Sequence, residues 1–354
     1  MKLLRSLRLF CNSVMNKNKK LLWQLPFLTA LIIATIFIVK QQRAMPYQHN
    51  EGFVFGTIYH ITYQSDKDLQ QEIEAELKKV DNSLSTFNPQ SVISKINNNQ
   101  PVTPDEMFVE VFRKAEEIAK ETDGAFDITV MPLVNLWGFG FKQGVNPSQS
   151  KIDSLKQYIG YQKVWLEGKQ IRKKQPNIML DCSAIAKGYG ADIVARLLRK
   201  NDISNFMIEI GGEIVTSGNS ENRLPWKIGV NRPIDDSTAT NMEIQTVLNV
   251  TDKAMATSGN YRNFYYKGGK KYAHTIDPKS GYPVQHSLLS ATVLTKDCAT
   301  ADAYATAFMV MGMEKAKKVL EKHEELMAYF IYTDKKGNLK VWYSPELEKK
   351  IVEE

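Results

Sequence analysis

The longest apolar segment of the chain is an uncharged run at residues 21–39, LLWQLPFLTALIIATIFIV. As a helix of 19 residues it would be about 28 Å long, which matches the hydrocarbon core of a bilayer. Every charged residue of segment 1–43 is a lysine or an arginine, and most of them precede the run. The positive-inside rule therefore predicts a basic cytoplasmic leader at 1–20, a transmembrane anchor at 21–39, and residues 44–354 on the periplasmic face of the inner membrane.

The alternative interpretation of this run is a helix buried in a protein core, but the flanking positive charges argue against it. No Ala-x-Ala-like cleavage site follows the run, and no cysteine follows it that could carry a lipid. We therefore expect an uncleaved anchor, followed by a polar linker at residues 40–51. Met15, which opens the basic stretch MNKNKK, is a second candidate for the first residue.

The rest of the chain alternates between strand-like and helix-like hydrophobic patterns. Apolar residues recur every three or four positions between 66 and 85, which is typical of an amphipathic helix. The sequence Thr103-Pro104-Asp105-Glu106 matches a helix-opening box with Thr103 as the N-cap. Further helices are expected at 183–200 and 300–311. Strands are expected at 53–63, 164–166, 170–172, 206–210, 265–272 (as a hairpin), 288–294, 329–332 and 339–343, and a loop at 139–152.

These elements do not alternate in the strict strand–helix–strand order of a doubly wound sheet. The pattern therefore predicts an α+β fold with mixed helices and largely antiparallel sheets. Because no internal linker or repeat interrupts it, we expect a single folded domain at residues 52–346, with a charged tail at 347–354.

Composition narrows the class of protein. The chain has 354 residues with 43% hydrophobic and 24% charged residues, which is ordinary for a globular protein and excludes a wholly disordered one. The net charge of +7 comes from the leader, since residues 1–43 hold eight bases and no acids. The remainder is nearly neutral, which argues against nucleic acid as a partner. The three cysteines lie far apart, so isolated thiols are favoured over a Cys182–Cys298 disulfide.

Three segments combine residues that could carry chemistry, and each also has a purely structural interpretation. Residues 181–190 run from a strand into a helix start rich in small residues. Asp181 precedes the helix and Lys187 lies on it, an arrangement that could bind an anion. The alternative is a plain helix cap by Asp181 or Ser183. No P-loop or G-x-G-x-x-G motif supplies a phosphate site elsewhere.

The second segment places Asp302 and Thr306 one helical turn apart on the same face, where two oxygens could bind a cation. Its alternative is a first-turn aspartate favoured by the helix dipole. In the third, His274 precedes Asp277 in a turn-rich stretch and could act as a base oriented by that carboxylate. Its alternative is a histidine that only hydrogen-bonds the loop. Aromatic residues beside glycines at 124–139 suit a planar ring, although such residues more often form a core.

Taken together, the ordered blocks of the chain resemble the ApbE family, the FAD:protein FMN transferases. The matching blocks are Gly56-Thr57 with Tyr59, LSTFN at 84–88 with Ser91, Ile96 and Asn97, GAFDITVMPLV at 124–134, LDCSAIAKGYGAD at 180–192, IEIGGE at 208–213, ATSGNYRNFY at 256–265, HTIDPKSGYPV at 274–284, and TADAYATAFMVMG at 300–312. They cover nearly all of residues 52–343. The membrane anchor differs from the lipoprotein leader of many relatives.

The resemblance implies a T-fold-like domain that binds FAD as a substrate together with Mg²⁺, and that moves FMN onto a threonine hydroxyl of a partner protein with release of AMP. It also implies roles for individual residues. His274 is the implied catalytic base, Ala184 (through its carbonyl oxygen), Asp302 and Thr306 are the implied metal ligands, and Phe55, Ala125, Phe126, Asp127, Asp181, Lys187 and Ile276 are the implied FAD contacts.

Alternatives remain open at this point. The same site could hydrolyse FAD to FMN and AMP, could hold flavin without catalysis, or the domain could be a solute-binding or adhesion module that binds no FAD. The chain has no acceptor motif of its own, since the nearest segment, Asp123–Thr129, has Phe126 at the position of a serine or threonine. The acceptor is therefore expected to be another protein, and the resemblance implies a membrane-anchored electron-transfer subunit of the Rnf or Nqr kind.

Overall fold

The computed structural model describes residues 26–40, 45–140, 147–235, 243–261 and 263–352. The chain divides into two units, residues 1–47 and 48–354. In the first unit, residues 26–40 are helical and exposed, with Phe27 and Phe37 among the most exposed apolar side chains. None of the helices in the described ranges has both the length and the apolarity needed to cross a bilayer. The first part of the predicted anchor, residues 21–25, lies outside these ranges.

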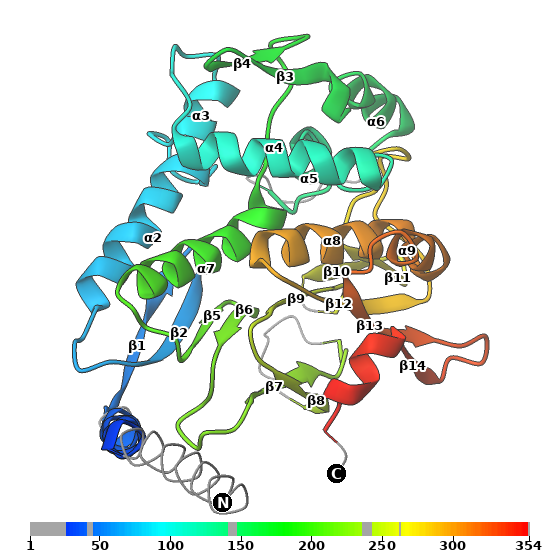
Figure 1. The fold of residues 1–354 in the computed structure, drawn as a ribbon. Coiled ribbons are helices and arrows are strands. Elements are labelled where there is room, and N and C mark those ends of the chain that lie inside the picture. The colour runs from blue at the N-terminus through cyan, green and yellow to red at the C-terminus, as the bar shows by residue number, and fades with distance from the viewer. Residues whose placement is uncertain (1–25, 41–44, 141–146, 236–242, 262, 353–354) are drawn as a thin grey trace, which may run out of the picture. The chain divides into compact units, whose positions relative to one another are not determined.

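The second unit is built on a sheet of eight strands within the described residues (Figure 1). Their order is β1 (Tyr47–Val54), β2 (Thr57–Gln64), β5 (Phe206–Ile210), β6 (Glu213–Ser217), β9 (Ala254–Gly259), β12 (Leu288–Thr295), β13 (Met327–Thr333) and β14 (Leu339–Tyr343). From β2 to β14 each neighbouring pair is antiparallel. The expectation of an α+β fold with largely antiparallel sheets is confirmed.

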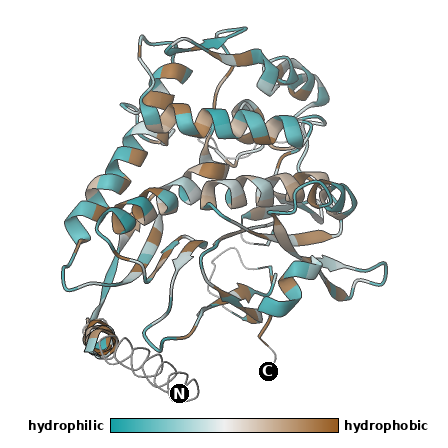
Figure 2. Ribbon diagram, in the orientation of Figure 1, coloured by the Kyte–Doolittle hydropathy of each residue, from teal (hydrophilic) through white to brown (hydrophobic). Residues whose placement is uncertain are grey.

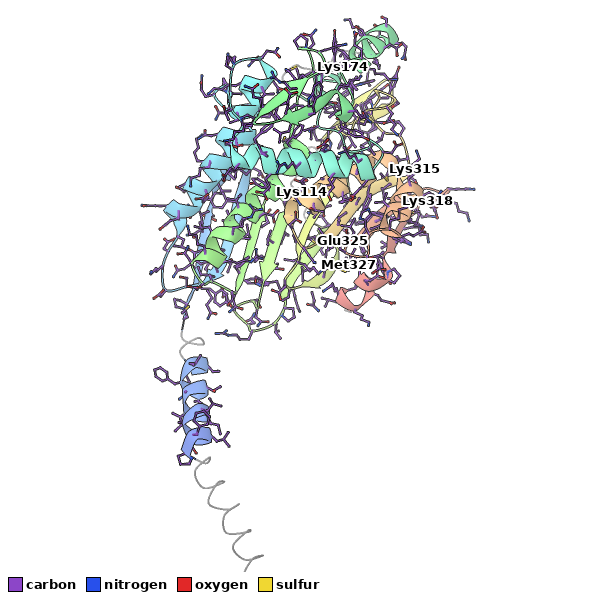
Figure 3. The ribbon with its side chains drawn as sticks, turned by 45° about the horizontal axis from the view of Figure 1, so that its top comes forward. Lys114, Lys174, Lys315, Lys318, Glu325 and Met327 are labelled. Atoms are coloured by element: carbon purple, nitrogen blue, oxygen red, sulfur yellow. The ribbon has the colours of Figure 1, made fainter. Side chains whose placement is uncertain are left out.

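Helices α2 (Gln70–Leu84), α7 (Ser183–Lys200) and α8 (Cys298–Met311) pack together beside this sheet, and α4 (Glu106–Glu121) packs on α7 and α8. Figure 1 shows α7 and α8 between the strands and α4. In Figure 2, α4 alternates teal and brown patches, as an amphipathic helix should. Lys114 of α4, labelled in Figure 3, bonds Thr300 Oγ1 at 2.8 Å and pairs with Asp297 at 3.0 Å, which ties α4 to the first turn of α8.

Shorter elements complete the domain. They are α3 (Val92–Asn97), α5 (Met131–Leu136), α6 (Gln149–Lys156), β3 (Val164–Glu167), β4 (Gln170–Lys173), β7 (Trp226–Asn231), β8 (Ile244–Val250), β10 (Phe264–Lys267), β11 (Lys270–Ala273), α9 (Met313–Leu320) and two 3₁₀ turns, Tyr161–Lys163 and Pro345–Lys350. The hairpins β3–β4 and β10–β11 confirm the sequence pattern. Cys182 and Cys298 are buried free thiols, as expected.

The single strand predicted at 53–63 is wrong, because the chain reverses at Phe55-Gly56 and forms two strands. Phe55 has φ 52° and Gly56 has φ 77°. A two-residue hairpin turn with both φ values positive is normally signalled by Asn-Gly or Asp-Gly. With Phe at this position, the sequence of the turn continues the apolar–polar alternation of a strand, so the pattern does not indicate a turn. A bulky residue in this backbone region is strained, and such strain concentrates at functional sites.

Other boundaries also differ from the sequence pattern. The N-cap of α4 is Asp105, which accepts from Phe108 N at 2.8 Å, and not Thr103. Strand β1 begins at Tyr47, inside the segment predicted as a linker. Helix α6 begins at Gln149, inside the predicted loop, of which residues 141–146 lie outside the described ranges. Near the C-terminus, Leu347 is fully buried, so the predicted charged tail is packed against the domain at that point.

Candidate functional site

A cavity of about 1370 Å³ opens in the second unit, beside the sheet and the N-terminal half of α7. Its volume exceeds the ~300–1,000 Å³ of common small-ligand pockets, so it is large enough for a dinucleotide. All eleven residues singled out from the sequence line it: Phe55, Ala125, Phe126, Asp127, Asp181, Ala184, Lys187, His274, Ile276, Asp302 and Thr306. The fold therefore brings to one place residues as far apart in the sequence as Phe55 and Thr306, which are 251 positions apart.

The candidate cation site has one residue on α7, Ala184, and two on α8, Asp302 and Thr306. The close packing of α7 on α8 brings them to the same cavity. A Cβ added to Gly188 would lie 2.3 Å from the carbonyl oxygen of Cys298, so only glycine permits this approach. Asp192 accepts from Cys298 N at 2.8 Å and Ala299 N at 2.9 Å, and burial raises its pKa to about 7. These contacts place Ala184 of α7 and the pair Asp302 and Thr306 of α8 on the same cavity.

The alternative interpretation of Asp302 as a first-turn residue is wrong, because α8 begins at Cys298 and Asp297 is its N-cap. Asp302 is 5% exposed and accepts from Gly188 N at 3.2 Å. Burial raises its pKa, while the Lys187 ammonium opposes the rise. A carboxylate, a hydroxyl and a backbone carbonyl are the hard oxygen donors that Mg²⁺ prefers. Among the described residues no group of three or more His, Cys, Asp or Glu forms a metal cluster, so a cation here would depend on the mixed oxygen set.

Lys187 lies between two carboxylates at the inner wall of the cavity. Its Nζ is 3.1 Å from Glu213 Oε1 and 3.9 Å from Asp302 Oδ2. Although burial lowers the pKa of Lys187, the two carboxylates outweigh it and hold the pKa above its ordinary value. Lys187 is therefore a fixed positive charge. Burial raises the pKa of Glu213, against the effect of Lys187.

Asp127 and Asp181 connect two of the sequence blocks. The Asp127 carboxylate accepts from Thr129 N, Thr129 Oγ1 and Tyr161 N at 2.7–2.8 Å, and Asp181 N donates to Ile128 O at 2.7 Å. Asp181 Oδ1 accepts from Ser183 N at 2.8 Å just before α7. The N-cap of α7 is Cys182, and no side chain caps this helix, so the plain-cap alternative for Asp181 or Ser183 is wrong. Burial raises the pKa of both aspartates. They hold the turn that presents Ala125 and Phe126 to the cavity.

Phe55 and Trp137 show how aromatic residues divide between site and core. The Phe55 ring packs on α7, where a Cβ at Gly190 would lie 2.6 Å from Phe55 Cε2. Trp137, from the stretch considered for a planar ring, is 3% exposed, stacks on Tyr272 and donates to Gly281 O at 2.8 Å. The core interpretation is right for Trp137, while Phe139 lines the cavity.

His274 is half-buried at the cavity, and its partner differs from the expected one. Its Nδ1 lies 3.2 Å from the carbonyl oxygen of Asn263, whereas Asp277 accepts from Lys279 N and Ser280 N in its own turn. A carbonyl only accepts, so Nδ1 carries the hydrogen and Nε2 holds the lone pair of the neutral ring. Burial, together with Lys187, lowers the pKa of His274. The neutral form required of a base is therefore favoured.

Sequence reasoning missed Glu213, which lines the cavity and is 3% exposed. The signal was present, because Glu213 directly follows two glycines that end a buried strand, an unusual position for a charge. Its ion pair with Lys187 joins strand β6 to helix α7, so no short-range pattern in the sequence predicts this contact.

Comparison with known proteins agrees with the resemblance seen in the sequence. The ApbE family model matches residues 55–330. The FAD:protein FMN transferase of Escherichia coli (strain K12) is 33% identical over 92% of this chain and 97% of its own length, and that of Haemophilus influenzae is 37% identical over 80% of this chain and 86% of its own.

Solved structures give the same result. The flavin transferase ApbE from Vibrio cholerae has a TM-score of 0.78 and 33% identity over 86% of this chain and 99% of that chain. The apo flavinyl transferase ApbE of Pseudomonas stutzeri has a TM-score of 0.77 and 29% identity over 86% of this chain and 97% of that chain. The ordered sequence blocks, the antiparallel fold and these matches together show that the chain belongs to the ApbE family.

Proposed function

We propose that this protein transfers FMN from FAD to a threonine hydroxyl of a partner protein and releases AMP. The observation that carries the proposal is the single cavity that gathers an oxygen-rich cation site, a fixed ammonium and a histidine with a free lone pair. The names of the family relatives, FAD:protein FMN transferase, support the same reaction.

The proposed cation is Mg²⁺, held by the Ala184 carbonyl oxygen, the Asp302 carboxylate and the Thr306 hydroxyl. When bound, it would neutralise phosphate charge and polarise the phosphoryl oxygens. Three protein ligands leave room for waters and substrate phosphates, which Mg²⁺ usually retains. Lys187 adds a positive charge that needs no proton exchange at neutral pH.

The remaining residues bind and orient the reactants. Apolar surface for the flavin ring comes from Phe55, Ala125, Phe126 and Ile276. Asp127 and Asp181 hold the turn that presents Ala125 and Phe126 to the cavity. His274 Nε2 takes the proton of the acceptor threonine as its Oγ bonds to the FMN phosphorus. The bond from that phosphorus to the oxygen that leaves with AMP breaks in line with the attack.

The proposal is tested by incubating the protein with FAD, Mg²⁺ and an acceptor subunit of the Rnf or Nqr kind. We expect the mass of an acceptor peptide to rise by one FMN group, in step with AMP release. An acceptor whose threonine is replaced by valine is the control. AMP release with no labelled acceptor would instead identify an FAD pyrophosphatase, and bound flavin without AMP would identify a non-catalytic flavoprotein.

We also propose that residues 21–39 anchor the protein in the inner membrane, with the catalytic domain on the periplasmic side. The exposed apolar side chains of residues 26–40 and the basic leader support this topology. The full chain is expected to stay with membranes after alkaline extraction, whereas a chain starting at Ala44 should be soluble and still bind FAD. A full chain released by alkali, or a shortened chain that folds but binds no FAD, would contradict this division.

A further inference from the structure

The buried carboxylate of Glu213 uses only one of its two oxygens within the described structure. Oε1 pairs with Lys187 Nζ at 3.1 Å, whereas Oε2 is buried and has no hydrogen-bond partner among the described residues. Glu213 lines the cavity, as do Lys187 and Asp302. Two carboxyl groups therefore share one ammonium at this wall, and one carboxyl oxygen lacks a partner.

A buried carboxylate oxygen without a donor is costly, because it has lost its water and gained nothing in return. Such an oxygen at the wall of a binding cavity indicates a donor that arrives with the ligand. Glu209, near the end of the preceding strand, gives a contrast. Its Oε1 accepts from Gly212 N at 2.6 Å and its Oε2 lies 2.9 Å from His60 Nδ1, so both of its oxygens have partners.

The neighbourhood of Glu213 indicates which donor is needed. Lys187 Nζ lies between Glu213 and Asp302, at 3.1 Å and 3.9 Å respectively, so Glu213 is separated from a proposed metal ligand by a single ammonium. Mg²⁺ keeps several waters, and carboxylates beyond the direct ligands orient such groups in metal sites.

We propose that Glu213 is a positioning residue of the cation site: Oε2 accepts a hydrogen bond from a water of the bound divalent cation, while Oε1 holds Lys187 beside Asp302. This inference rests on the proposed Mg²⁺ site. It assigns Glu213 a direct effect on the cation in addition to its contact with Lys187. The alternative is that Glu213 only neutralises Lys187.

A double-mutant cycle distinguishes the two possibilities, because it measures the affinity for the metal and needs no turnover. Mn²⁺ alone is titrated into the purified full chain, and the free ion is followed by its EPR signal. The variants are Glu213→Gln, Lys187→Met and the pair of both. We expect Glu213→Gln to weaken Mn²⁺ binding about 10–100-fold, the usual effect of losing an outer-shell partner, and to do so with or without Lys187.

The matched control is Glu74→Gln, which removes the same charge from the exposed rim of the same cavity and should leave the affinity unchanged. If Glu213→Gln fails to fold, the paired variant still decides the question, because it leaves no unpaired buried ammonium and is compared with Lys187→Met alone.

Unchanged affinity in Glu213→Gln, or a loss that disappears in the Lys187→Met background, would overturn the role of Glu213. Asp302→Ala distinguishes this failure from a failure of the proposed metal site. If Asp302→Ala binds Mn²⁺ like the wild type, the site itself is misplaced. If Asp302→Ala loses binding while Glu213→Gln keeps it, only the present inference is wrong.

Discussion

Replacement of Asp302 by alanine is expected to abolish AMP release at Mg²⁺ concentrations that saturate the wild type. Asp302 supplies the only charged ligand of the proposed set, since Thr306 offers a hydroxyl and Ala184 a carbonyl oxygen. Raised Mg²⁺, or Mn²⁺ with its similar ligand preference, should restore part of the activity. The measurement is AMP release as a function of metal concentration for both proteins.

Thr306→Ala is the graded comparison, because a water can replace a neutral ligand, and its midpoint should shift less. The fold should survive in Asp302→Ala, since Lys187 then pairs with Glu213 alone and the wall carries no net charge. Thermal unfolding followed by circular dichroism checks this. If Asp302→Ala and the wild type have the same midpoint and the same plateau, Asp302 is not a ligand.

The sequence predicted the parts of the fold and site that depend on short-range pattern. The amphipathic period of 66–85 corresponds to α2, and the spacing of Asp302 and Thr306 placed both on one face of α8. The backbone carbonyl of Ala184 has no such signal, because every residue has a carbonyl. Only the family resemblance pointed to it, and the packing of α7 on α8 explains why it reaches the same cavity.

The features that the sequence concealed depend on tertiary contact or on unusual backbone conformation. The turn at Phe55-Gly56 uses a residue that normally avoids positive φ, so the sequence pattern predicts the middle of a strand there. The pairing of Lys187 with Glu213 joins a helix to a strand. The partner of His274 is a backbone carbonyl eleven positions earlier. Asp277, three positions later, is the partner that the sequence pattern predicts, but its carboxylate accepts from its own turn.

His274→Ala is expected to slow transfer about 10²–10⁴-fold while FAD remains bound, which is the usual contribution of a general base. The alcohol of threonine has a high pKa, so its proton must be removed as the phosphorus–oxygen bond forms. Nδ1 is turned to the Asn263 carbonyl, which leaves Nε2 as the atom that can accept this proton. Transfer under single-turnover conditions, with FAD binding measured separately, gives the size of the effect.

The pH dependence gives an independent test of the same role. Burial lowers the pKa of His274 below its ordinary value of 6.5, and a base works only when neutral, so activity governed by this group should be at its plateau at pH 7. It should fall only as the pH drops below 6.5, and His274→Ala should lack this decline.

Asp277→Asn is the matched control, since its side chain bonds its own turn, and it should keep both the rate and the profile. A His274→Ala variant with wild-type turnover would remove this residue from the mechanism, and a decline centred above pH 6.5 would assign the proton transfer to a different group.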